Sequence, residues 1–191
     1  MERKHFLQGM VYFGGGIALL SPTILLQGCS YESRKRTDLN AVDIPFLDEI
    51  GETILPTTEE SPGAKSAAIG QYMVTMVNEC LEGEKQRIFL EGLNHLDAHC
   101  AAQYKKSFVD LDSETRLKII QGLQEEAIEY GIKNEGSDKV GSPHYFDLLK
   151  GLTISGYFSS EIGMTKAREY VPVPGKYIGC VTIGANRKPL S

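Results

Sequence analysis

One glutamate and two histidines recur at intervals of four residues in the middle of the chain, at Glu91, His95 and His99. On a helix this spacing places the three side chains on one face, and two imidazoles one turn apart can hold zinc or copper. A solvated polar helix face has the same pattern, and no H-E-x-x-H motif accompanies it. Metal or small-ligand binding therefore stays an alternative function.

Four cysteines are the other reactive side chains, and none forms a CxxC or CxxCH motif, so neither a zinc ribbon nor c-type haem attachment is indicated. Cys80 and Cys100 lie on apolar stripes, which predicts buried thiols. Cys180 lies in an irregular tail, which favours an exposed or partner-linked thiol. Without Cys29 the count is three, so an internal pair with one spare thiol and a bond to another chain both stay open.

Cys29 ends an apolar run in the sequence LQGC, which resembles a bacterial lipobox, with an apolar residue at −3 and a small one at −1. In such a motif the cysteine thiol receives diacylglycerol, and cleavage then makes this residue the new N-terminus. Glycines 14–16 and Pro22 interrupt the run, which favours a removable signal over a permanent span. We expect residues 1–28 to be a signal peptide and the product to be lipid-anchored to a bacterial membrane, facing the periplasm or the cell exterior.

The start of the chain resembles the twin-arginine export motif S-R-R-x-F-L-K, carried by Arg3, Lys4, Phe6 and Leu7. Lys4 stands where that motif has its second arginine, so twin-arginine export and general secretion both stay open. The distinction matters because the twin-arginine route carries proteins that have already folded. An ordinary signal peptide with a chance cysteine is the alternative to the lipobox.

The remaining chain has the composition of one globular domain. The whole sequence has 191 residues, 41% hydrophobic and 24% charged, with a formal net charge of −5. No block of Lys and Arg follows the signal region, so a nucleic-acid partner is not indicated. We expect residues 29–42 to be a lipidated N-terminus and polar tether, and residues 43–191 to be the folded domain.

Apolar residues at helical spacing predict a small all-α bundle of about five helices. The first stripe covers 46–54 and stops before Pro56, and the second covers 69–80 after a Ser61-Pro62 cap. A third follows Gly83, a fourth runs from an Asp112 cap to Gly131, and a fifth from Ser142-Pro143 towards Gly156. Prolines at 172 and 174 exclude a helix there and predict an irregular, extended C-terminal tail.

No catalytic constellation stands out in this helical pattern. Gly151, Gly156 and Gly163 do not follow a strand, so dinucleotide and P-loop motifs are excluded. Ser159 and Ser160 lack the G-x-S-x-G context of a hydrolase.

Three segments carry a resemblance to the gluconate 2-dehydrogenase subunit 3 family: FLDEIGETILP (46–56), HYFDLLKGLTISGYFSSEIG (144–163) and YVPVPGKYIGC (170–180). The resemblance implies a small subunit without flavin, haem or metal of its own. It pairs with an FAD-dependent large subunit of the glucose–methanol–choline type, and a multihaem cytochrome c can complete the complex. Signal-bearing members escort the large subunit through export.

Within this resemblance, aromatic and proline-rich residues are the expected contacts to the partner. The candidates are Gly156, Tyr157, Phe158, Pro172, Pro174, Gly175, Tyr177 and Cys180. The alternative is that Tyr157 and Phe158 fill the chain's own core. The resemblance implies no catalytic, cofactor-binding or metal-ligating residue in this chain.

Overall fold

The computed structural model describes residues 31–134, 142–173, 175 and 180. Every helix described lies in one unit of the chain, residues 32–191. Five α-helices make up this unit, and no β-strand occurs among the described residues, so the predicted all-α class is confirmed. They are α2 (Ile44–Ile54), α3 (Ile69–Glu79), α4 (Gly83–Tyr104), α5 (Ser113–Asn134) and α6 (Tyr145–Ser159).

Short helical turns connect these helices. Three are 3₁₀ turns: η2 (Ala41–Asp43), η3 (Ala64–Ala67) and η4 (Phe108–Asp110). A π-helical turn, η5 (Gly163–Ala167), follows α6 and leads into the chain at 168–173, which is not helical, as the tail prediction expected.

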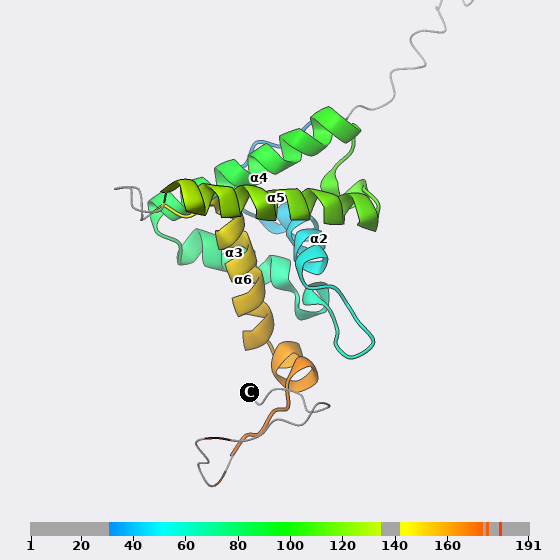
Figure 1. Cartoon of the computed structure of the whole chain (residues 1–191), viewed down its shortest axis with the longest axis vertical. Coiled ribbons are helices and arrows are strands. Elements are labelled where there is room, and N and C mark those ends of the chain that lie inside the picture. Colours follow the sequence, from blue (N-terminus) through cyan, green and yellow to red (C-terminus); the bar gives the residue numbers. More distant parts are fainter. Residues whose placement is uncertain (1–30, 135–141, 174, 176–179, 181–191) are drawn as a thin grey trace, which may run out of the picture. The chain divides into compact units, whose positions relative to one another are not determined.

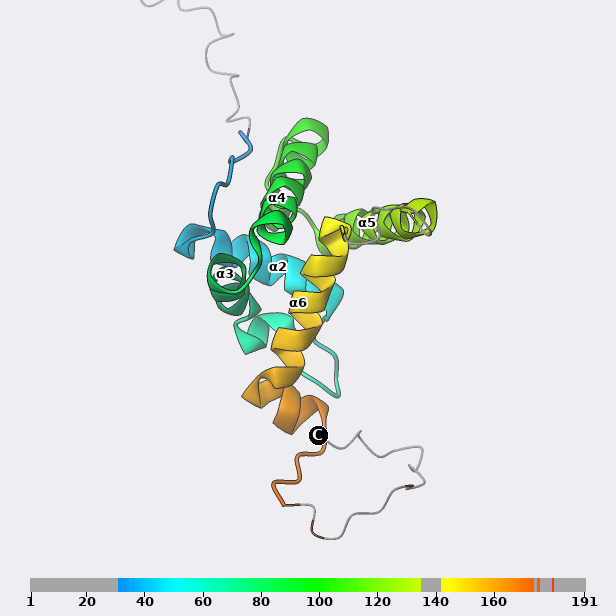
Figure 2. The same ribbon diagram turned by 90° about the vertical axis from the view of Figure 1, so that its left-hand side faces the viewer.

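Helix α6 is the centre of the bundle, because it packs against each of the other four α-helices. Figures 1 and 2 show it crossing below α4 and α5 while α2 and α3 lie beside it. Phe146, Leu149 and Tyr157 are buried along its length. Thr153 is also fully buried, and its hydroxyl donates to the carbonyl of Leu149 at 2.8 Å, so this polar atom does not lack a partner.

The core is built from helical stripes that sequence periodicity anticipated. On α4, Phe89, Leu93, Leu96 and Cys100 recur at steps of four, three and four and are all buried. Phe46 of α2 meets Phe108 of η4 edge to face, with ring centroids 6.1 Å apart. Burial of these apolar side chains is the main favourable term for the fold.

Several predicted helix ends are wrong. Ser61-Pro62 does not begin a helix: Ser61 lies in a loop, where its hydroxyl meets the Tyr157 hydroxyl at 2.8 Å. Helix α3 starts only after Ala68, whose positive φ of 51° separates η3 from α3. Helix α5 continues past Gly131 to Asn134, where Lys133 pairs with Glu129 one turn earlier.

The last helix also begins later than predicted. Its N-cap is His144 rather than Ser142, and the backbone N–H of Phe146 donates to His144 Nδ1 at 3.3 Å. By contrast, the predicted Asp112 cap of α5 is confirmed, because the N–H of Thr115 donates to its carboxylate at 2.9 Å.

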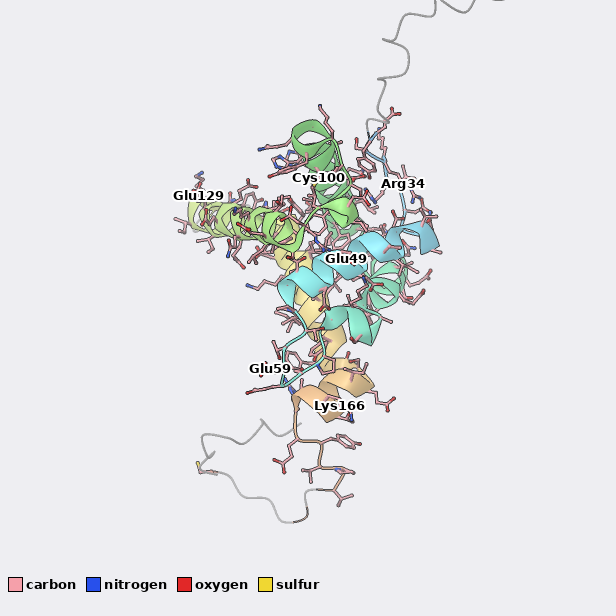
Figure 3. The ribbon with its side chains drawn as sticks, turned by 90° about the vertical axis from the view of Figure 1, so that its right-hand side faces the viewer. Arg34, Glu49, Glu59, Cys100, Glu129 and Lys166 are labelled. Atoms are coloured by element: carbon pink, nitrogen blue, oxygen red, sulfur yellow. The ribbon has the colours of Figure 1, made fainter. Side chains whose placement is uncertain are left out.

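The segment before η2 differs from the expected tether, because from Arg34 onward it is packed against the domain (Figure 3). Arg36 is only 5% exposed, and its guanidinium donates to Asp43 at 2.8 Å and to Asp97 at 3.1 Å. The same guanidinium lies 4.4 Å from the centroid of the Phe46 ring. Both carboxylates are buried, so this arginine is a counter-ion that the interior requires.

Amide groups hold the same segment in place. Asn94 of α4 accepts from the N–H of Arg36 at 2.7 Å and donates to its carbonyl at 2.9 Å. Asn78 of α3 makes the same pair of bonds to Leu39, which is 2% exposed. Residues 34–39 are therefore a docked strap, which periodicity could not reveal because its contacts lie about 40 to 60 positions away.

In the part of the chain that the structure describes, no helix is both long and apolar enough to cross a membrane.

Candidate functional site

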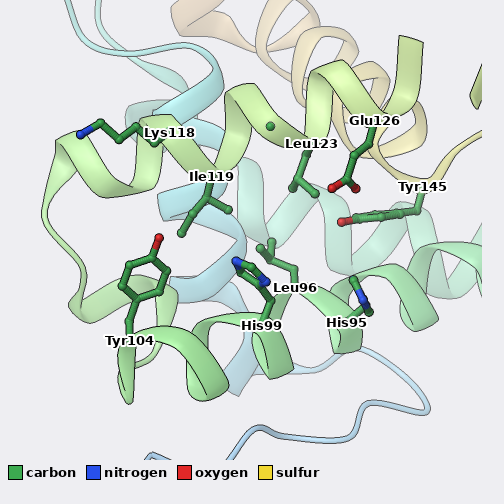
Figure 4. A pocket seen from close by; sticks show the side chains of 10 residues that line it. His95, Leu96, His99, Tyr104, Lys118, Ile119, Leu123, Glu126 and Tyr145 are labelled. Atoms are coloured by element: carbon green, nitrogen blue, oxygen red, sulfur yellow. The ribbon is translucent and has the colours of Figure 1, made fainter. Parts of the chain in front are cut away.

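A pocket of about 240 Å³ lies between α4 and α5, and the first residue of α6 closes one end (Figure 4). Its aliphatic lining consists of Leu96 of α4 and Ile119 and Leu123 of α5. Polar side chains of three helices line the rest. They are His95, His99 and Tyr104 of α4, Lys118 and Glu126 of α5, and Tyr145 of α6.

His95 and His99 lie where the sequence predicted, on one face of α4, and both line the pocket. Glu91 does not join them: its two carboxylate oxygens accept from Arg87 at 3.1 Å on an exposed part of the helix. Among the described residues no group of three His, Cys, Asp or Glu side chains could hold a metal ion. The geometry of the described residues therefore gives no support to the alternative in which Glu91, His95 and His99 hold a metal.

Tyr145 is the most unusual polar residue of the pocket. Its ring lies over α4 at Gly92, where the Cβ of any other residue would fall 2.1 Å from the ring, so only glycine allows this approach. The side chain is 9% exposed, and its hydroxyl is buried with no hydrogen-bond partner. Burial, then the nearby Glu126 charge and Cys100, raise the pKa of Tyr145 well above its usual range, so the phenol stays protonated.

Two neighbouring groups are also perturbed. Burial lowers the pKa of His144 despite the acidic side chains of Asp147 and Glu126, and its ring packs between Tyr130 and Tyr145. Burial, aided by Asp97, raises the pKa of the Cys100 thiol to about 11, which makes it unreactive.

Free thiols are found at all three described cysteines. Cys100 is buried and Cys180 is exposed, as expected, but Cys80 is exposed, so its predicted burial is wrong. Cys80 follows the last residue of α3, beyond the point where the apolar stripe of that helix faces the core.

The predicted partner contacts divide into two groups. Gly156 and Tyr157 are buried, and the Tyr157 hydroxyl donates to the carbonyl of Pro62. Both residues pack in the chain's own core, which for Tyr157 is the alternative that the sequence left open. Phe158 is half-buried, with the Arg168 guanidinium 4.4 Å from its ring centroid.

The second group is in the tail. Pro172, Gly175 and Cys180 are exposed, and the neighbouring Tyr170 and Val173 are large apolar residues with exposed fractions of 52% and 81%. Pro174 and Tyr177 lie outside the described residues, as do the lipidation candidate Cys29 and the export candidates Arg3, Lys4, Phe6 and Leu7.

Sequence reasoning found two of the polar residues in the pocket and missed Tyr104, Lys118, Glu126 and Tyr145. One signal pointed to the missing contact: Gly92 interrupts the apolar stripe of α4, and a glycine within a helix often marks a close approach. Its partner, Tyr145, is 53 positions later, at a distance that local patterns do not reach.

The family model described as Gluconate 2-dehydrogenase subunit 3 matches residues 41–175, more than half of the chain. The match begins at η2 and ends in the tail, so it covers all five α-helices. Neither a curated protein nor a solved structure matches the chain.

Proposed function

Because the chain belongs to the gluconate 2-dehydrogenase subunit 3 family, we propose that it is the non-catalytic small subunit of an FAD-dependent dehydrogenase. In this role it binds a large flavoprotein of the glucose–methanol–choline type, escorts it through export and tethers it to the membrane. The family match carries the proposal, and the family is one of accessory subunits of dehydrogenase complexes. The flavin belongs to the large subunit, and a cytochrome c subunit with haem c is a further partner.

The exposed tail supports an interface at the end of α6. Tyr170 and Val173 present large apolar surfaces to solvent, and Phe158 and Arg168 lie close to where the tail begins. Exposed aromatic and aliphatic groups beside an arginine are the usual composition of an interface core.

Co-purification tests the proposal. The tagged chain is extracted from membranes of its own host, and we expect a flavoprotein with the absorbance of FAD to accompany it. The double variant Tyr170→Ser, Val173→Ser should reduce the amount of flavoprotein recovered about tenfold. Val42→Ser is the matched control, because Val42 is 74% exposed on η2 and should leave recovery unchanged. A stable chain recovered without any flavoprotein would contradict the proposed role.

Export and anchoring are tested separately. Cys29→Ser should abolish incorporation of labelled fatty acid and release the chain from membranes, whereas Cys80→Ser, which removes the exposed thiol at the end of α3, should change neither. Lys4→Arg restores the paired arginines and should leave export intact if the twin-arginine route is used. Export that persists in a strain without that route would show that general secretion carries the chain.

A further inference from the structure

The pocket between α4 and α5 contains a buried hydroxyl that nothing in the described chain satisfies. The Tyr145 hydroxyl has no hydrogen-bond partner although its side chain is nine-tenths buried. A buried polar group without a partner costs about 1–3 kcal/mol relative to one that is paired. Figure 4 shows this hydroxyl pointing into the pocket from the end formed by α6.

A second polar group beside it is also available. The Glu126 charge acts on Tyr145, and its carboxylate accepts no hydrogen bond from any residue that the structure describes. Lys118, at the other end, is already paired with Glu114 at 2.8 Å. Beside the Tyr145 hydroxyl the charged group is therefore the Glu126 acceptor, and it favours a ligand that donates from hydroxyls at this end of the pocket.

The rest of the lining narrows the ligand class. His95, His99 and Tyr104 each offer a ring atom that can accept or a group that can donate, and the His99 and Tyr104 rings lie 6.4 Å apart. Aliphatic side chains lie among these polar groups: Leu96 beside His99 on α4, and Ile119 and Leu123 on α5 (Figure 4). A ring that carries both apolar C–H bonds and hydroxyls could contact both kinds of side chain at once.

The size of the pocket agrees with such a ligand. Sites for drug-sized molecules measure about 300–1,000 Å³, and this pocket is about 240 Å³. It is also far larger than the roughly 30 Å³ that one water molecule occupies. The pocket volume therefore fits a ligand between these two sizes, with about a dozen non-hydrogen atoms.

We propose that this pocket binds a neutral, polyhydroxylated small molecule of the monosaccharide class, with its hydroxyls on Tyr145, Glu126 and the α4 imidazoles. The site is separate from the tail surface and does not depend on the proposed role as a partner subunit.

The test is titration of the purified chain with D-glucose, followed by calorimetry and by the NMR resonances of the histidine rings. A ligand of this size should bind with a dissociation constant on the order of 1 mM, and the His95 and His99 signals should shift with saturation. D-Gluconate, which places a carboxylate opposite Glu126, should bind more weakly.

Two variants identify the groups involved. Tyr145→Phe should weaken D-glucose binding about fivefold while the free chain is at least as stable, because the hydroxyl that it loses is unpaired. Glu126→Gln should weaken binding about tenfold. Glu129→Gln is the matched control: this acid is also exposed on α5 but pairs with Lys133 and does not line the pocket, so affinity should not change.

Absence of saturable binding by D-glucose would overturn the proposal. So would tighter binding of D-gluconate than of D-glucose, or an equal loss of affinity in the Glu129→Gln control. A crystal structure at saturating D-glucose that shows only ordered water on the Tyr145 hydroxyl would also overturn it.

Discussion

Replacing Arg36 by Met tests whether the docked strap is part of the folding unit. Arg36 donates to both Asp43 and Asp97, which are 1% and 0% exposed. The variant keeps most of the side-chain volume but leaves two buried carboxylates without this counter-ion. Removing one member of a buried ion pair costs about 3–5 kcal/mol, because the remaining charge stays in a poorly solvated place.

The structure indicates the lower end of that range. Arg34 also donates to Asp43 at 3.1 Å through its 37% exposed side chain and to Asp97 at 3.0 Å through its N–H, so both carboxylates keep part of their compensation. We therefore expect a loss of about 3 kcal/mol in the free energy of unfolding. For a chain of this length, that loss corresponds to a midpoint temperature lower by about 6–12 °C.

Urea unfolding followed by far-UV circular dichroism measures this loss. Arg87→Met is the matched control, because Arg87 pairs with Glu91 at the same 3.1 Å but both side chains are more than 60% exposed. Its effect should stay within about 0.5 kcal/mol. Arg36→Lys, which keeps the charge but loses the planar fork, should fall between the two. Equal losses in Arg36→Met and Arg87→Met would refute the argument that the strap is a buried part of the fold.

Three further predictions concern the site and its surroundings. Gly92→Ala should lower the free energy of unfolding by about 1–3 kcal/mol, because the new Cβ meets the Tyr145 ring. Gly151→Ala, with nothing near its Cβ, should raise it by up to about 1 kcal/mol in the same urea assay. Because folding lowers the pKa of His144, the free energy of unfolding should fall as the pH falls from about 6.5 through the native pKa. His144→Asn caps α6 without titrating and should remove this pH dependence. A pH dependence that persists in the variant would assign it to another group. In the Cys29→Ser variant, a thiol reagent at mildly alkaline pH should label Cys80 and Cys180 in the native chain and Cys100 only after denaturation. Mass spectrometry measures the labelling of each cysteine, and rapid labelling of Cys100 in the native chain would contradict its burial.

The sequence predicted the helices well because their signals are local. The apolar stripes of α4 and α5 repeat at helical spacing, and the Asp112 cap lies beside the helix that it starts. The helix starts predicted from serine followed by proline are wrong, because Ser61 and Ser142 lie in loops whose path is decided by tertiary contacts. His144 is the N-cap of α6 through its ring nitrogen, although histidine is not among the preferred N-cap residues.

The candidate site was predicted only in part, for the same reason. His95 and His99 share a helix face and could be found from spacing alone. Tyr145 and Glu126 join them only because α5 and α6 pack against α4, and no local pattern encodes that contact. The strap was missed because Arg36 appears in a polar stretch, where a charged side chain is usually solvated.

The docked strap also limits how far the domain can stand from a bilayer. The N–H of Arg34 already donates to Asp97 at 3.0 Å, so the packed chain begins five positions after Cys29. Five residues of fully extended chain span at most about 18 Å. If Cys29 carries the lipid, as we propose, the α4 side of the domain is held close to the headgroups. The same short linker then limits the distance of a bound flavoprotein from the membrane surface. Inserting residues between Cys29 and Arg34 would increase the maximum distance between the domain and the bilayer. The docked strap and the helices behind it should stay unchanged.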